Sequence, residues 1–110
     1  MGEFSDQVFA IVAHIPRGRV CSYGQVARLM GRPRSGRYVG YALRGNPSPG
    51  AEGAYPCHRV VHKDGELAGA FAFGGPGVQR ALLEAEGVAF LSDGRVDMDA
   101  CAWFGDVSSL

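Results

Sequence analysis

Two short helices joined by a tight turn constrain the fold of this chain more than any other feature. Ser22 is followed three positions later by Gln25, a capping-box pattern that predicts a helix over residues 23–30. Ser35 is a second N-cap residue and predicts a helix over residues 36–44. Short helices in such close succession are typical of a helix-turn-helix unit.

The connection between these helices is Gly-Arg-Pro-Arg at residues 31–34, where Gly31 stands at the C′ position. Between residues 17 and 44 there are seven arginines and no acidic residue. Arginine donates bidentately to phosphate, and the first turn of the second helix favours an anion through its N–H groups and its dipole. The pattern indicates a surface for a polyanion, and a solvated arginine-rich face is the alternative.

Composition supports one globular domain with an uneven charge distribution. Residues 1–63 carry nine basic and three acidic residues (net +6), and residues 64–110 carry two and eight (net −6). The length of 110 residues predicts a single domain over residues 1–110, with a core at about 5–90 and a C-terminal hairpin and tail at 91–110. No apolar run reaches the roughly 18 residues of a membrane span and no signal peptide is evident, so we expect a cytoplasmic protein.

Helical periodicity predicts one more helix on each side of the pair. The first begins at Ser5 and ends at Pro16 and Gly18. Its buried face is expected to comprise Val8, Ile11, Val12 and Ile15. The last helix, over residues 77–86, is ended by Gly87. Its buried face is expected to comprise Val78, Ala81, Leu82 and Ala85.

The β structure expected from the sequence is small. Cys57 precedes a short strand, and Asp-Gly at 64–65 predicts a hairpin turn after it. Residues 90–96 predict a second hairpin, with Trp103 and Phe104 packed against it. The predicted fold class is therefore mainly α with a small β element.

Cys57 is the candidate nucleophile, because His58 and Arg59 place a base and a permanent cation beside it. Neighbours in a strand point to opposite faces, so adjacency alone does not make a catalytic pair. A small buried cysteine beside a polar residue is the alternative interpretation.

Cys21 and Cys101 lack basic neighbours, and we interpret them as packing residues. Three scattered cysteines indicate neither a disulfide framework nor a metal site. We therefore expect reduced thiols and no metal or other cofactor.

Five sequence blocks point to one family. They are VCSYGQVA at 20–27, PRSGRYVG at 33–40, LRGNP at 43–47, PCHRVV at 56–61 and LLEAEG at 82–87. In order and spacing they resemble the DNA-binding domain of the O6-alkylguanine-DNA alkyltransferase family over about residues 5–90. The resemblance implies a winged-helix-like helix-turn-helix fold that binds duplex DNA.

The resemblance also implies a catalytic set. Cys57 matches the cysteine that accepts the alkyl group from guanine O6 in one irreversible event. His58 matches the histidine that deprotonates it through a water, and Glu86 matches the carboxylate that orients the histidine. Asn46 matches the asparagine that links the recognition helix to the active-site loop.

For DNA contact, the resemblance implies that Tyr23 donates to the departing base or crowds its phosphate as the nucleotide rotates. Arg37 matches the arginine finger that fills the gap left by the flipped nucleotide. Arg34, Ser35 and Arg59 complete the expected DNA-binding set. The expected partner is double-stranded DNA containing O6-alkylguanine, bound by a monomer through the minor groove.

The chain also departs from the family pattern. Because the sequence begins almost at the first helix, we expect a protein without the amino-terminal domain that many members carry. The loop at 66–75 is longer and more apolar than the family pattern. Its ending at 94–98 with Trp103 resembles the alkyltransferase-like proteins, which sense lesions and carry another residue at the cysteine position.

Three hypotheses follow from these observations. The leading one is stoichiometric alkyl transfer to Cys57. The second is a non-catalytic lesion sensor that recruits nucleotide excision repair proteins. The third is a helix-turn-helix regulator with a base-sequence preference.

Overall fold

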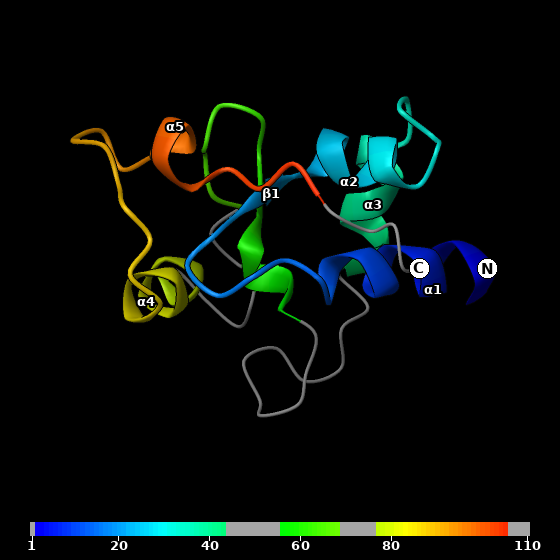
Figure 1. Ribbon diagram of the computed structural model, residues 1–110, viewed down its shortest axis with the longest axis horizontal. Helices are drawn as coiled ribbons and strands as arrows, with labels where there is room; N and C mark the ends of the chain where they lie inside the picture. Colours follow the sequence, from blue (N-terminus) through cyan, green and yellow to red (C-terminus); the bar gives the residue numbers. More distant parts are fainter. Residues whose placement is uncertain (1, 44–55, 69–76, 106–110) are drawn as a thin grey trace.

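A computed structural model describes residues 2–43, 56–68 and 77–105 (Figure 1). The helices are α1 (Gly2–Val12), α2 (Tyr23–Leu29), α3 (Gly36–Leu43), the 3₁₀ helix η1 (Cys57–Arg59), α4 (Val78–Ala85) and α5 (Met98–Cys101), and the strands are β1 (Cys21–Ser22) and β2 (Val60–Val61). Helices α1, α2 and α3 lie together on one side, α4 and α5 lie on the other, and the strands lie between them. The predicted fold class, mainly α with a small β element, is confirmed.

The start of α2 follows the predicted cap in part. The Ser22 hydroxyl accepts the backbone N–H of Gln25 at 3.1 Å. The Gln25 side chain does not complete the capping box, because its amide donates to the backbone oxygen of Phe104 at 2.8 Å. The predicted hydrogen bond from the Gln25 backbone to the Ser22 hydroxyl is therefore confirmed. The expected return bond of the Gln25 side chain is replaced by its bond to Phe104, which is distant in the sequence.

The turn between α2 and α3 is fixed by backbone geometry. Gly31 has a φ of 77°, and the N–H of Arg32 donates to the oxygen of Ala27 at 2.9 Å. This pairing is the Schellman ending that glycine permits. Ser35 follows directly, and its carbonyl accepts the N–H of Val39 at 3.0 Å in the first turn of α3.

Helix α1 begins earlier than the sequence predicts. It starts at Gly2, so Ser5 lies inside the first turn and is not the N-cap residue. Phe4 packs against the hydrophobic core, and this contact stabilises the additional helical residues before Ser5. The four residues predicted to be buried, Val8, Ile11, Val12 and Ile15, are all buried, but α1 ends at Val12 and Ile15 lies in the turn that follows it.

The two strands form a parallel pair that the sequence did not predict. Cys21 pairs with Val60 and Ser22 with Val61, which brings the start of α2 beside the chain that leaves η1. The predicted turn after β2 is present, with the Gly65 N–H donating to the His62 oxygen at 2.9 Å. Gly65 has a φ of 93°, and a Cβ there would collide with the Val96 carbonyl.

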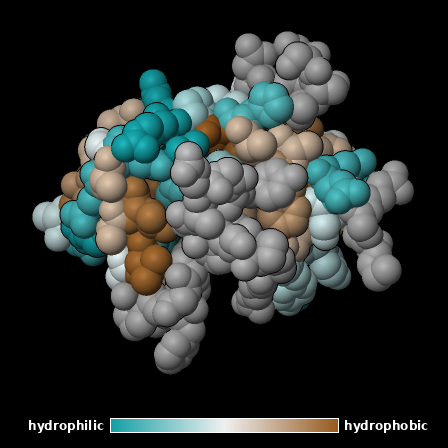
Figure 2. Space-filling model, turned by 90° about the horizontal axis from the view of Figure 1, so that it is seen from below, coloured by the Kyte–Doolittle hydropathy of each residue, from teal (hydrophilic) through white to brown (hydrophobic). Residues whose placement is uncertain are grey.

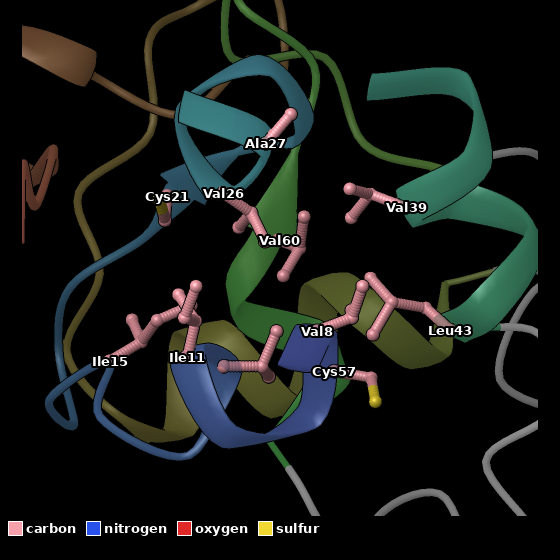
Figure 3. Packing of buried hydrophobic residues seen from close by; sticks show 11 residues of the cluster. Val8, Ile11, Ile15, Cys21, Val26, Ala27, Val39, Leu43, Cys57 and Val60 are labelled. Carbon is pink, nitrogen blue, oxygen red and sulfur yellow. The ribbon is translucent and has the colours of Figure 1, made fainter. Parts of the chain in front are cut away.

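The buried residues form two clusters. The first lies between α1, α2, α3 and the turn that carries Cys57 (Figure 3), and comprises Val8, Ile11, Val12, Ile15, Cys21, Val26, Ala27, Val39, Leu43, Cys57 and Val60. The second lies beside α4 and comprises Val20, Val61, Leu83, Val88, Val96 and Cys101. Because Val60 and Val61 are consecutive, β2 supplies one residue to each cluster and joins them.

The predicted buried face of α4 is wrong. Ala81 and Ala85 are exposed and Val78 and Leu82 are half-buried. The buried residues of this helix are Gln79 and Leu83. Apolar side chains gather at the left of the face in Figure 2, on the side where Figure 1 places α4. The reason for the rotation is the Gln79 amide, which is buried because backbone groups of other segments satisfy it.

The C-terminal hairpin forms as predicted, with an antiparallel bridge between Phe90 and Val96. The expected packing of Trp103 and Phe104 on it is wrong. Trp103 packs against the first cluster and its backbone N–H donates to the Val20 carbonyl oxygen at 2.7 Å, while Phe104 is 73% exposed. A short helix that the sequence did not predict, α5, precedes them and is capped by the Asp97 carboxylate.

Over the described ranges, the helices are too short or too polar for any of them to cross a bilayer.

Candidate active site

Cys57 opens the 3₁₀ helix η1 and is not the flank of an extended strand. Pro56 precedes it, and the Arg59 N–H closes the turn on the Pro56 oxygen at 3.0 Å. Proline suits the start of a helical turn because it has no N–H to leave unpaired. Only 1% of Cys57 is exposed, and Figure 3 shows its sulfur pointing away from Val26 and Val60 at the edge of the first cluster.

His58 and Glu86 meet across the site, from η1 and from the end of α4. His58 Nε2 lies 2.8 Å from Glu86 Oε2, and the two side chains are 11% and 7% exposed. This contact brings together two of the residues that the sequence analysis selected from segments far apart in the chain.

Glu86 is ionised in this setting. Burial raises the pKa of its carboxyl, but hydrogen bonds and charge from Arg59 and His58 outweigh burial and lower the pKa to about 2. An ionised carboxylate only accepts hydrogen bonds, so His58 Nε2 carries the proton of this contact. In neutral His58 the basic nitrogen is therefore Nδ1.

Arg59 is committed to the same carboxylate. Its Nε donates to Glu86 Oε1 at 2.9 Å and its Nη2 to Oε2 at 2.8 Å. The remaining nitrogen, Nη1, donates to the Ile15 oxygen at 2.7 Å. All three guanidinium nitrogens thus face protein oxygens, and this geometry gives no support to the DNA contact expected for Arg59.

Tyr23 opens α2 and lies against a residue that the sequence analysis missed. Its ring centroid is 5.1 Å from that of His62, which follows β2. The parallel pairing of Ser22 with Val61 explains the approach, since the next residue of each strand is one of these rings. A Cβ at Gly40 would lie 3.7 Å from the Tyr23 ring, so α3 also approaches it closely.

The outward face of α3 and the turn before it carry several exposed cationic and aromatic residues. Arg34 and Arg37 are exposed, and Ser35 is half-buried between them. Tyr38 and Tyr41 are 59% and 52% exposed, and their rings meet edge to face at 5.9 Å.

The arginine-rich stretch does not form one face. Arg17 donates to the Ala85 oxygen at 3.1 Å and Arg19 to the Ala100 oxygen at 3.5 Å, so both lean toward α4 and α5. The guanidinium of Arg32 lies over the Phe4 ring, and Arg28 donates to the Gln25 side chain. Arg44 and Asn46 lie outside the described residues.

The remaining cysteines have the packing positions expected for them. Burial raises the pKa of the Cys21 thiol to about 12, which suppresses its thiolate. Cys101 is buried in the second cluster, and its sulfur accepts the Ala89 N–H at 3.4 Å. All three cysteines lie in described ranges and none forms a disulfide. No group of three metal-ligating side chains occurs among the residues of those ranges.

The sequence model of the family "6-O-methylguanine DNA methyltransferase, DNA binding domain" matches residues 3–88. This chain belongs to that DNA-repair alkyltransferase family. The helix pair, the Cys57 turn and the Glu86 carboxylate all lie inside the matched range.

The relatives include proteins named for DNA base flipping and proteins named as methyltransferases. A DNA base-flipping protein of Escherichia coli is 42% identical over 104 residues, covering 91% of this chain and 74% of that protein. The mouse methylated-DNA–protein-cysteine methyltransferase is 45% identical over 71 residues, covering 64% of this chain but 32% of the enzyme. The crystal structure of S. pombe Atl1 in complex with damaged DNA containing O6-carboxymethylguanine superposes with a TM-score of 0.77 at 32% identity, over 94% of this chain and 96% of that one.

Gln79 is a second residue near this site, after His62, that the sequence analysis overlooked. Its buried amide contacts the backbone of the Cys57 turn, as described below. A helical projection centred on Glu86 contains the signal, because residues seven positions apart share one face of a helix.

Proposed function

We propose that this chain binds duplex DNA through α3 and accepts the alkyl group of an O6-alkylguanine on Cys57. The observation that carries the proposal is the contact between His58 and the ionised Glu86. His58 lies on the same short turn as Cys57. A thiolate is the reactive form of cysteine, and an adjacent oriented base is the usual means of generating it.

The transfer balances without a cofactor. The thiol proton passes to His58 Nδ1, through a water, because Nε2 is already donating to Glu86. Cys57 Sγ attacks the alkyl carbon, so the S–C bond forms as the C–O6 bond breaks and its electron pair returns to the base. The departing base takes up one proton from the Tyr23 hydroxyl and remains in the DNA strand as guanine. Exchange with solvent then returns a proton to Tyr23 and removes the thiol proton from His58. The thioether on Cys57 is not hydrolysed, so each chain acts once.

Glu86 and Arg59 act through His58 and are positioning residues. The fork of Arg59 fixes both carboxylate oxygens, and the carboxylate then fixes the tautomer and direction of the His58 ring. We therefore assign Arg59 to this internal role in place of a DNA contact. Asn46, expected to link the recognition helix to the active-site loop, stays a prediction from the family resemblance.

We infer that Arg34 and Arg37 face the DNA, with Ser35 at the helix start between them. Arg37 fills the gap left by the flipped nucleotide, and Tyr23 acts where the nucleotide rotates. Tyr38 and Tyr41 extend the same outward face with aromatic surface suited to sugar and base edges. The exposure of these side chains and the DNA-bound relatives support this assignment.

Intact-protein mass spectrometry tests the transfer directly. After incubation with a duplex containing O6-methylguanine, we expect a gain of one methyl group per chain, located on Cys57 by peptide mapping. Cys57→Ser should show no gain, and the buried Cys21 should stay unmodified. Methylation of Cys57→Ser to the same extent as the wild type would refute the assignment.

The second candidate is lesion recognition without transfer. It is favoured by the match to S. pombe Atl1, which covers nearly all of both chains. In this case the protein binds the alkylated duplex as a monomer and recruits nucleotide excision repair proteins. Lesion-selective binding together with an unmodified Cys57 after prolonged incubation would support the sensor and exclude the transferase.

A further inference from the structure

Helix α4 contacts the Cys57 turn through two side chains, and only one of them, Glu86, contacts the His58 ring. Glu86, at the end of α4, contacts the side chains of His58 and Arg59. Gln79 lies two helical turns earlier on the same face and contacts the backbone of the turn.

The Gln79 amide is buried and saturated with backbone partners. The residue is 5% exposed, and its Nε2 donates to the oxygens of His58 and Val60, both at 3.0 Å. The His58 carbonyl is one of the last carbonyls of η1, and such carbonyls have no partner within their own helix. Gln79 therefore supplies from α4 the hydrogen bonds that the end of this turn lacks.

The same amide reaches the other side of the site. Its Oε1 accepts the N–H of Ala68 at 2.8 Å, at the point where the described chain after β2 ends. One side chain thus joins the Cys57 turn, strand β2 and the segment that leaves the turn at 62–66.

We propose that Gln79 is a positioning residue for alkyl transfer, which fixes the orientation of the peptide groups between Cys57 and Val60. The inference rests on the proposed function. A buried carbonyl without a donor is costly, so the turn must tilt toward another donor or water once the amide is removed. In-line attack tolerates little misplacement of the sulfur, and shifts of about 1 Å can cost about 100-fold in rate.

Two substitutions divide the role of the amide. Gln79→Met keeps the length and the apolar stem but makes none of the three hydrogen bonds. Gln79→Glu keeps an acceptor for Ala68 and loses the paired N–H donors to His58 and Val60. Gln25→Met is the matched control, because it removes a helical glutamine amide whose partners, the Phe104 oxygen and the Arg28 guanidinium, do not belong to the Cys57 turn.

Single-turnover methylation is measured against the concentration of duplex containing O6-methylguanine, which separates the maximal rate from half-saturation. We expect Gln79→Met and Gln79→Glu to lower the maximal rate at least tenfold and to change half-saturation by less than about twofold. Gln25→Met should react at the wild-type rate. Thermal unfolding identifies the folded variants, and Gln79→Ala, which leaves room for water at the two carbonyls, replaces Gln79→Met if that variant does not fold.

A wild-type maximal rate in folded Gln79→Met, or in Gln79→Ala where that variant replaces it, would overturn the inference. A wild-type maximal rate in Gln79→Glu alone would show that only the contact with Ala68 matters, and would overturn the role of the N–H donors. If the wild type itself transfers no methyl group, the proposed function fails. The positioning of Cys57 is then decided by its rate of alkylation with iodoacetamide, which requires no DNA. A rate in the folded variant equal to that of the wild type would overturn the inference in that case too.

Discussion

Glu86 Oε2 lies 2.8 Å from His58 Nε2, although the two residues are 28 positions apart in the sequence. The same carboxylate accepts hydrogen bonds from Nε and Nη2 of Arg59, so one buried anion is shared by the His58 ring and a permanent cation. This sharing makes Glu86 the residue at which stability and the proposed chemistry are most tightly connected.

Glu86→Gln should impair both properties. The amide keeps the shape but removes the charge that holds Arg59 and fixes the His58 tautomer. We expect the methyl-transfer rate to fall by about 10- to 100-fold and the free energy of unfolding by about 3 kcal/mol, the typical cost of breaking a buried ion pair from one side. Urea unfolding and single-turnover kinetics measure the two effects.

The matched control for this substitution is Glu84→Gln, on the same helix. Glu84 is exposed and its ion pair with Arg80 spans 3.6 Å at the surface. We expect a change within about 0.5 kcal/mol and an unaltered transfer rate. Equal loss in the two variants would show that the effect belongs to helix charge and not to the buried contact.

The free energy of unfolding should fall at acidic pH as Glu86 becomes protonated. Its pKa is lowered from 4.5 to about 2 on folding, so the contribution is fully present above about pH 4.5 and is lost as the pH falls toward 2. The full contribution is up to about 3 kcal/mol, from about 1.4 kcal/mol per pKa unit. Denaturant unfolding between pH 5 and pH 2 should be steeper in pH for the wild type than for Glu86→Gln, and parallel curves would contradict the assignment.

Arg37→Ala should weaken lesion discrimination more than general affinity for duplex. An arginine that fills the vacancy in the base stack acts only once the nucleotide has left it. Fluorescence anisotropy with matched duplexes, with and without O6-methylguanine, measures the ratio of the two affinities. Proportional weakening on both duplexes would argue for a simple phosphate contact.

The salt dependence of binding should be shallower than seven arginines imply. Each phosphate contact adds about 0.9 to the slope of log affinity against log salt, and Arg17 and Arg19 are turned toward backbone oxygens near α4 and α5. We expect Arg34→Ala to lower the slope by about 1 and Arg19→Ala to leave it unchanged. A fall of equal size in both variants would place Arg19 on the DNA face.

The features predicted correctly from the sequence are those that neighbouring residues determine. The Ser22 cap, the Gly31 ending and the buried stripe of α1 each depend on spacings of a few residues. The His58–Glu86 contact was anticipated through the resemblance to the alkyltransferase family and not through spacing, because no local rule joins residues that far apart.

The errors have physical causes of the opposite kind. Hydrophobic periodicity assigned Ala81 to the buried face of α4, but carbonyls of η1 and β2 draw Gln79 inward and turn the helix. The parallel pairing of β1 with β2 joins segments about 40 residues apart and leaves no local turn signal. Trp103 likewise forms a backbone hydrogen bond with Val20 and packs against the first cluster, although its place in the sequence predicted packing on the C-terminal hairpin.

The dependence of the Cys57 turn on α4 sets an order of events during synthesis. All residues of the helix pair and of its proposed DNA-facing surface have been synthesised once the first half of the chain has left the ribosome, whereas Gln79 and Glu86 emerge 21 and 28 residues after His58. Contacts of long sequence separation form late in folding. The nascent chain therefore forms its proposed DNA-facing helices before Cys57 acquires its final setting, and the proposed alkyl transfer to Cys57 has to wait until α4 has been made.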